Sequence, residues 1–384
     1  ETPRRLFEKG VTAEEVLRLN LVRSDFFDVR RQSFSIAPGG DSLQPPRPVK
    51  AVAGGEVRKR GTKVELSGRL TDATTGKLIF NRTYPLGDPP DRWAVHSFSD
   101  DIVLYLTGER GTATTRIAYV GDATGKKEIY VVDADGARAE MVTTLGSITV
   151  SPRWSPDGER LAFTTFARGR PELVGLRLKE SRTWTISSRE GMNSAPCWHP
   201  DGQHLAASLS FEGNSEIYIL DAQGREARRL THSMAIDTSP TFSPDGSRLA
   251  FTSDRSGEPQ VYVMGADGTG LSRLTYVGKH CDSPDWSPKG DRIVFVSLID
   301  PSVFDICTVR PDGTDLWRLT AGNANHENPR WAPDGRHIVF AKRERGRRNL
   351  WVMAADGSGI RQLTYARGDQ YNPAWSPPLS VSGP

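Results

Sequence analysis

Ser151-Pro-Arg-Trp-Ser-Pro-Asp-Gly158 is the stretch that decides the fold, because close copies of it recur along the rest of the chain. The copies occupy residues 195–202, 239–246, 283–290, 328–335 and, in truncated form, 372–379. Each carries an aromatic anchor, and successive anchors lie 44 or 45 residues apart: Trp154, Trp198, Phe242, Trp286, Trp331 and Trp375. A regular period of about 44 residues is typical of the four-stranded blades of a β-propeller.

Each repeat predicts four short strands. In the copy that starts at Ser239, they fall at 241–243, 248–253, 260–264 and 271–275. These runs are bounded by Gly, Pro, Asp and Ser, which is the usual pattern of strands and turns. We interpret the anchors and their Pro-Asp-Gly turns as packing and turn-forming elements, and none of the turns as an active site.

The last anchor, Trp375, is not followed by the apolar second strand that follows the other anchors. A matching strand lies upstream at 117–120, with further strand patterns at 129–133 and 141–145. We therefore expect the strand around Trp375 to complete a blade begun by residues 116–145. The sequence thus predicts six blades, closed by a strand from the far end of the chain.

The predicted fold class is mainly β, with a six-bladed β-propeller at 113–384 preceded by an α/β domain at 1–112. In the first domain, Thr12 and Glu15 form a capping box ahead of an amphipathic helix at 13–27. A loop at 34–48 leads to a strand at 50–58, then to a hairpin with strands at 64–70 and 78–84. A second helix is expected at 91–107, with a linker at 108–114.

Composition excludes several functional classes. The net charge of +3, with both signs common, gives no sign of a nucleic-acid partner. No apolar run approaches the roughly 18 residues of a membrane span, and no export signal is recognisable at the start. The three cysteines, Cys197, Cys281 and Cys307, form neither an even disulfide framework nor a metal-binding spacing, and two of them fall in predicted strands as buried thiols.

Known catalytic motifs are incomplete. No Gly-x-Ser-x-Gly elbow occurs. Residues 121–127 resemble a phosphate loop but lack its full spacing and its final hydroxyl residue. His326-Glu327 begins a zincin motif, but Arg330 replaces the second histidine. Residues 133–136 lack the rest of a calcium loop, and a turn explains them better. We expect no enzyme, no cofactor and no metal.

The connections between blades remain as the candidate site. All of them are predicted to lie at one end of the propeller, and the residues four and five positions before each anchor differ from blade to blade. Such variation favours a binding mouth, although neutral loops vary in the same way. The candidate partner-binding residues are Met192, Asn193, Asp237, Thr238, His280, Asp282, His326, Glu327, Asp369 and Tyr371.

A basic run lies in one loop at the same end. It comprises Lys342, Arg343, Arg345, Arg347 and Arg348. Such a run is usually a solvated loop, but it could also steer an acidic partner toward the mouth.

A small α/β domain followed by six such blades resembles the TolB family of the bacterial Tol-Pal system. Two stretches carry the resemblance beyond the repeat itself: Thr115-Arg-Ile-Ala-Tyr-Val120 at the start of the propeller, and Asn372-Pro-Ala-Trp-Ser-Pro377 at its end. The likeness covers residues 12–380.

The resemblance implies a periplasmic, non-catalytic, monomeric protein that supports envelope integrity and cell division. It implies that the propeller mouth binds the peptidoglycan-associated lipoprotein Pal, at a site that colicins can occupy during protein import. Met192 and Asn193 match the loop where the family contacts Pal, although a histidine is common at the first of these positions. The family docks to TolA through an N-terminal segment, of which only about eleven residues precede the first helix here, so TolA binding is doubtful.

Two alternatives stay open. A metal-dependent polysaccharide lyase would use His232, His280 and His326, which come from neighbouring mouth loops and could converge on one ion. The regulatory propeller of a peptidase is the other, although no hydrolase domain follows the repeats.

Overall fold

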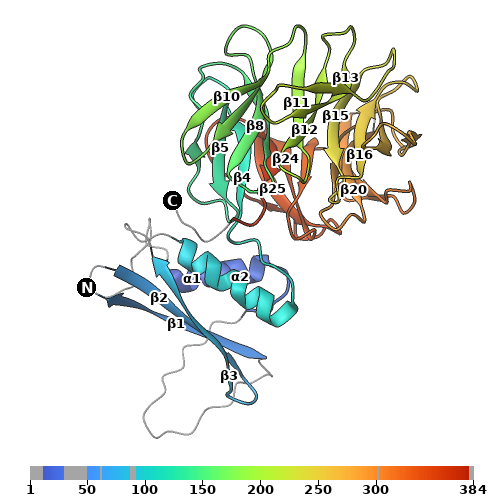
Figure 1. Ribbon diagram of the computed structural model, residues 1–384. Coiled ribbons are helices and arrows are strands. Elements are labelled where there is room, and N and C mark those ends of the chain that lie inside the picture. The colour runs from blue at the N-terminus through green and yellow to red at the C-terminus, as the bar shows by residue number, and fades with distance from the viewer. Residues whose placement is uncertain (1–11, 30–49, 61–62, 87–91, 301, 380–384) are drawn as a thin grey trace, which may run out of the picture. The chain divides into compact units, whose positions relative to one another are not determined.

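The computed structural model describes residues 12–29, 50–60, 63–86, 92–300 and 302–379, and two compact units meet in the sequence between Thr114 and Thr115. The first unit contains α1 (Ala13–Arg23), β1 (Ala51–Arg60), β2 (Lys63–Asp72), β3 (Leu78–Leu86) and α2 (Trp93–Thr107). Its three strands form one antiparallel sheet in the order β1-β2-β3, and α2 packs on β2 and β3 (Figure 1).

The predicted capping box of α1 is confirmed. The Glu15 amide donates to Thr12 Oγ1, and the Glu15 carboxylate accepts from the Thr12 amide. The helix ends at Arg23, however, not at residue 27. The Ser24 hydroxyl donates to the Leu21 carbonyl, and Asp25 adopts a φ of 58°, a left-handed conformation that cannot continue an α-helix.

The core of the first unit gathers on the sheet side of the helices. Phe98 of α2 is buried against Phe80 and Tyr84 of β3. Gly68 of β2 lies beneath the same ring, where an added Cβ would approach the Phe98 ring to 2.8 Å. The packing of α2 on the sheet therefore requires glycine at this position. The loop predicted at 34–48 falls outside the described residues.

The second unit consists of six four-stranded antiparallel sheets, the blades of a propeller (Figure 1). From inner to outer strand, the blades are β7 (Thr149–Trp154), β8 (Arg160–Thr165), β9 (Glu172–Arg177), β10 (Arg182–Ser187); β11 (Asn193–Trp198), β12 (His204–Leu209), β13 (Glu216–Asp221), β14 (Ala227–Arg229); β15 (Asp237–Phe242), β16 (Arg248–Ser253), β17 (Gln260–Gly265), β18 (Ser272–Arg273); β19 (Cys281–Trp286), β20 (Ile293–Asp300), β21 (Val303–Val309), β22 (Trp317–Arg318); β23 (His326–Trp331), β24 (His337–Glu344), β25 (Arg347–Ala354), β26 (Arg361–Gln362); and β27 (Gln370–Trp375), β4 (Arg116–Gly121), β5 (Glu128–Asp133), β6 (Glu140–Met141).

The predicted closure of the ring is confirmed. Strand β27 pairs antiparallel with β4, so that Tyr371 lies opposite Val120 and Ala374 opposite Ala118. The indole of Trp154 donates to the Ala374 carbonyl at 3.0 Å, which ties the closing strand to the following blade. The chain therefore joins its last strand to a blade whose other strands precede all the repeats.

The inner strands are longer than predicted, because each tolerates a proline by bulging. The prediction 241–243 corresponds to β15 at Asp237–Phe242, which includes Pro240. In every inner strand the residue before the proline has a φ between 48° and 56°, as in Ser239, and the register with the second strand shifts there. The bulge removes the proline from the hydrogen-bonding ladder, to which it could not donate.

The outer strands are shorter than predicted. The strand predicted at 271–275 is observed as β18, which spans only Ser272–Arg273. The strand predicted at 141–145 is observed as β6, at Glu140–Met141. In place of further strand pairing, the Thr275 hydroxyl accepts from the Val261 amide at 2.9 Å, and Thr143 accepts from Ile129 in the same way. A threonine side chain thus ends the ladder at the blade edge.

Candidate functional site

All six inner strands begin at one end of the ring, which we call the mouth. Because neighbouring strands within a blade are antiparallel, the loop between the second and third strands lies at this end too. So does the connection from each outer strand to the next inner strand. The candidate residues from Met192 to Tyr371 belong to these connections or to the first two residues of an inner strand.

The first residue of every inner strand is buried. The exposed fractions are 0% for Thr149, Asn193, Asp237 and Cys281, 4% for His326 and 1% for Gln370. These residues face partners inside the blades, such as Thr165 beside Thr149 and Ser297 beside Cys281. The residue type at this position therefore differs between blades because its buried partner differs, and the position is not a row of exposed contacts.

Asn193 holds the connection that precedes it. Its Oδ1 accepts from the Ser187 hydroxyl at 2.6 Å, and its Nδ2 donates to the Arg189 carbonyl at 2.7 Å. Met192, the neighbouring candidate, is 41% exposed, and its amide donates to Ser210 Oγ at 2.8 Å. The asparagine thus shapes the loop, and the methionine is the residue that reaches the surface.

The side chains of Asp237 and His326 are likewise buried and interact with residues of the blades. Arg255 Nη2 donates to Asp237 Oδ2 at 2.6 Å, and burial raises the pKa of this carboxyl although the arginine opposes that effect. His326 Nδ1 lies 3.5 Å from Asp305 Oδ1, and its ring meets Phe340 edge to face. Burial lowers the pKa of His326, which favours the neutral imidazole.

The second residue of each inner strand is less buried. Val150, Ser194, Thr238, Asp282 and Glu327 are partly exposed, whereas Tyr371 is 7% exposed. Thr238 accepts from the Ser208 hydroxyl at 3.3 Å, and Asp282 accepts from the Thr252 hydroxyl at 2.8 Å. These bonds link each side chain to the preceding blade while leaving part of it accessible.

One arginine organises the acidic candidates. Arg348 Nε donates to Asp369 Oδ2 at 3.0 Å, and its Nη1 lies 3.5 Å from Glu327 Oε2. Its guanidinium carbon lies 4.4 Å from the centre of the Tyr371 ring. Burial would raise the pKa of Asp369, but its bonds to Arg348 lower it overall. Sequence reasoning placed Arg348 in a basic loop without finding this cluster.

The rest of the basic run divides in two. Lys342 pairs with Glu344 at 3.5 Å and lies over the Trp351 ring at 4.4 Å. Arg343, Arg345 and Arg347 are exposed in the hairpin that joins β24 to β25. Together with Asp282, Glu327, Arg348 and Asp369, these three arginines form what we call the charged arc.

A second group of exposed side chains was largely missed from the sequence. It lies in the connections that precede β7, β11, β15 and β19, which are neighbours around the ring. We call it the apolar arc, and it contains Ile148 (44% exposed), Met192 (41%), Met234 (100%), Ile236 (53%) and Tyr276 (73%). Large apolar side chains concentrated in this way are typical of an interaction surface. The sequence did contain a signal for this surface, since these apolar residues interrupt connections that are otherwise polar.

The three histidines of the metal-site alternative do not assemble. His232 is exposed, His280 meets Phe304 edge to face at 5.4 Å, and His326 is buried. Across the described ranges, no close group of metal-capable side chains includes any of them. The geometry therefore gives no support to a lyase centre at the mouth.

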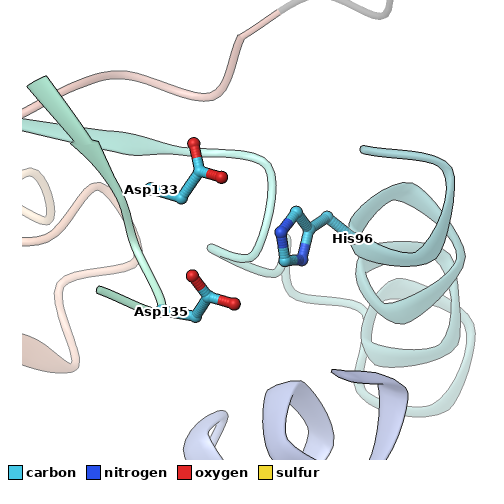
Figure 2. A group of neighbouring side chains, drawn as sticks. All are labelled: His96, Asp133 and Asp135. Atoms are coloured by element: carbon cyan, nitrogen blue, oxygen red, sulfur yellow. The ribbon is translucent and has the colours of Figure 1, made fainter. Parts of the chain in front are cut away.

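The stretch at 133–136 forms a turn, as predicted. Asp133 ends β5 and Asp135 follows it (Figure 2). The Gly136 amide donates to the Asp133 carbonyl at 2.8 Å, and the Ala137 amide to Asp135 Oδ1 at 3.0 Å. Arg138 pairs with Asp133 at 2.9 Å. Both carboxylates thus serve the turn and its neighbours.

The closed ring and its loop-built mouth define a class, the six-bladed β-propellers completed by a C-terminal strand. Within that class the chain belongs to the TolB β-propeller family, because the family model described as the TolB beta propeller domain matches residues 104–379. Neither described helix is long and apolar enough to span a lipid bilayer.

Individual proteins agree with this assignment. The Tol-Pal system protein TolB of Geobacter sulfurreducens is 40% identical over 155 residues, which cover 38% of this chain and 36% of that protein. A TolB homolog of Chlorobium chlorochromatii is 39% identical over 108 residues, 28% of this chain and 24% of that protein. The aligned stretches thus span a quarter to just over a third of these relatives. The crystal structure of TolB from Acinetobacter baumannii superposes with a TM-score of 0.81 at 28% identity, covering 95% of this chain and 93% of that one.

Proposed function

We propose that the chain is a non-enzymatic, periplasmic scaffold of a Tol-Pal-like system, which binds a Pal-like peptidoglycan-associated lipoprotein at the propeller mouth. In this role it supports envelope integrity and cell division. The family assignment and the relatives named as Tol-Pal system proteins support the system. The observation that carries the binding site is a mouth that combines the apolar arc with the charged arc, beside which Tyr365 adds a further ring that is 78% exposed.

The two arcs suit a folded protein partner. Protein interfaces combine apolar contacts that exclude water with a polar rim that fixes orientation. The apolar arc supplies several large side chains on neighbouring connections, with Met234 and Tyr276 the most exposed. The charged arc supplies carboxylates held in place by Arg348, so they can accept hydrogen bonds without first being ordered.

The contact residues follow from accessibility. The proposed contact set consists of the candidates with exposed surface: Met192, Thr238, His280, Asp282, Glu327 and Asp369. The Tyr371 ring packs against the Arg348 guanidinium and helps to hold it in place. Asn193, Asp237 and His326 support the set from inside the blades. TolA is not included in the proposal, and residues 1–11 lie outside the described part of the chain.

Charge reversal at the mouth tests the proposal. The protein carrying Asp282→Lys with Glu327→Lys is compared with wild type for binding to the purified soluble domain of the organism's own Pal-like lipoprotein, by calorimetry. We expect affinity to fall by at least tenfold, because two acceptors become repulsive donors. The matched control is Glu159→Lys with Glu180→Lys, which reverses two exposed charges in turns at the opposite end of the ring. Equal affinity for all three proteins would refute the proposed site.

A further inference from the structure

A second group of charged side chains lies deeper in the ring, one position before each aromatic anchor. The six residues at this level are Arg153, Cys197, Thr241, Asp285, Arg330 and Ala374. They occupy the same position in the six inner strands, which surround the ring axis. Because these positions stand at one level of strands that surround the axis, we infer that their side chains converge across the ring. In agreement, the charges that act on Arg153 come from Arg330 and Asp285, which lie four and three blades further along the chain, and from the neighbouring Cys197.

The charges at this level do not balance. Two guanidinium groups face one carboxylate, and burial raises the pKa of the Cys197 thiol, so that group stays neutral. Thr241 and Ala374 carry no charge. Burial, followed by the positive charge of Arg330, lowers the pKa of Arg153 to about 9, which still leaves it protonated at neutral pH. The ring therefore holds one uncompensated positive charge.

Arg330 keeps one donor without a partner. Its Nη1 donates to the carbonyls of Pro329 at 2.9 Å and Ser283 at 3.2 Å. Its Nε is buried, donates no hydrogen bond to any of the described residues, and lies 4.0 Å from Asp285 Oδ1. The Asp285 carboxylate is already engaged, because its Oδ2 accepts from the Trp331 amide at 2.8 Å. The residue as a whole is 6% exposed.

We propose that Arg153 and Arg330 bind one small monovalent inorganic anion, of the chloride type, within the propeller channel. A buried charge is costly unless it is paired, and an anion of charge −1 would balance this level of the ring. It would also accept from the unpartnered Nε of Arg330. A divalent anion would leave an excess of negative charge beside Asp285. The single uncompensated positive charge therefore favours a monovalent anion. The Asp285 side chain is 19% exposed, so small solutes can reach this depth.

Bromide is the direct probe, because it replaces chloride and scatters anomalously. Crystals of the full chain soaked in sodium bromide are expected to show an anomalous peak at hydrogen-bond distance from Arg330 Nε. The peak should vanish in Arg153→Gln and persist in Arg182→Gln, which removes an exposed arginine from an outer strand. A channel without bromide in wild-type crystals, or an unchanged peak in Arg153→Gln, would overturn the proposal.

A solution measurement on the wild-type protein covers the case in which Arg153→Gln does not fold. The thermal midpoint is followed in chloride and in isethionate, a larger organic anion, at equal ionic strength. We expect a saturable rise of about 2 to 4 °C in chloride alone, since a ligand that binds only the folded state raises its stability. Identical midpoints in the two series would contradict a chloride site.

Discussion

At the scale of single residues, burial separates two roles that the sequence could not distinguish. Asn193 and Met192 are neighbours, and both were predicted to contact a partner. The asparagine is fully buried and uses its amide inside the blade, whereas the methionine side chain reaches the surface. The same division separates Asp237 from Thr238 and His326 from Glu327. Adjacent residues on a strand point to opposite sides, which explains the second and third pairs, whereas Met192 lies in the connection before β11.

Asn193→Ala tests the structural role of the buried residue. The change leaves the Ser187 hydroxyl and the Arg189 carbonyl without their partner, so we expect the free energy of unfolding to fall by about 1 to 3 kcal/mol. Urea denaturation followed by tryptophan fluorescence provides the measurement. Ser194→Ala, at the partly exposed next position, is the control and should have little effect. Equal stability of the two variants would show that Asn193 does not hold the connection.

At the scale of the strand and turn, the repeat predicted the second and third strands well and the edges poorly. The prediction 248–253 coincides with β16, because an apolar run between turns leaves little choice of boundary. The inner strand was predicted too short, since Pro240 argues against a central strand unless a bulge removes it from the ladder. The outer strand was predicted too long, because the threonine that ends it resembles a strand residue in sequence.

The closing strand is the element on which the ring depends. Trp375 pairs with Ile117 of β4, packs partly buried against the core cluster that contains Ile117 and Val339, and donates from its indole to Thr115 Oγ1 at 2.7 Å. We expect Trp375→Ala to lower the free energy of unfolding by about 2 to 4 kcal/mol, somewhat less than the truncation of a fully buried tryptophan, because this side chain is partly buried. Trp317→Ala, which truncates a tryptophan that is 47% exposed on an outer strand, is the matched control. If both variants unfold at the same denaturant concentration, the Trp375 side chain does not stabilise the closure of the ring.

The Ser-Pro-Asp-Gly turns predict a loss of stability in acid. The Ser243 hydroxyl, then the amide and hydroxyl of Ser247, lower the pKa of Asp245 to about 2. Since the unfolded carboxyl titrates near 3.8, its contribution is complete above pH 4 and is lost as the pH falls toward 2. Thermal midpoints measured from pH 5 to pH 2 should fall less steeply for Asp245→Asn than for wild type. The exposed Glu258→Gln in the same blade is the control, and an unchanged slope in Asp245→Asn would count against this role.

At the scale of the whole propeller, the six blades share one scaffold and differ at their connections. The period of the anchors was enough to predict six blades, because similar core contacts recur from blade to blade. The strand missing after Trp375 and its match at 117–120 predicted the closure. The composition of the mouth was less predictable. Exposure of Met234 or Tyr276 depends on how each connection leaves its outer strand, and the capture of Glu327 and Asp369 by Arg348 joins residues 21 positions apart. Neither relation follows from the spacing of the repeat.

The most direct test of the mouth as the partner-binding face is site-specific photo-crosslinking in the native cell. A photoreactive amino acid is placed at Met234, which is fully exposed on the apolar arc, or at Lys179, which is exposed in a turn at the opposite end of the ring. We predict a crosslink to a Pal-like lipoprotein from position 234 and none from position 179. A lipoprotein crosslinked only from position 179, or from neither position, would contradict the account.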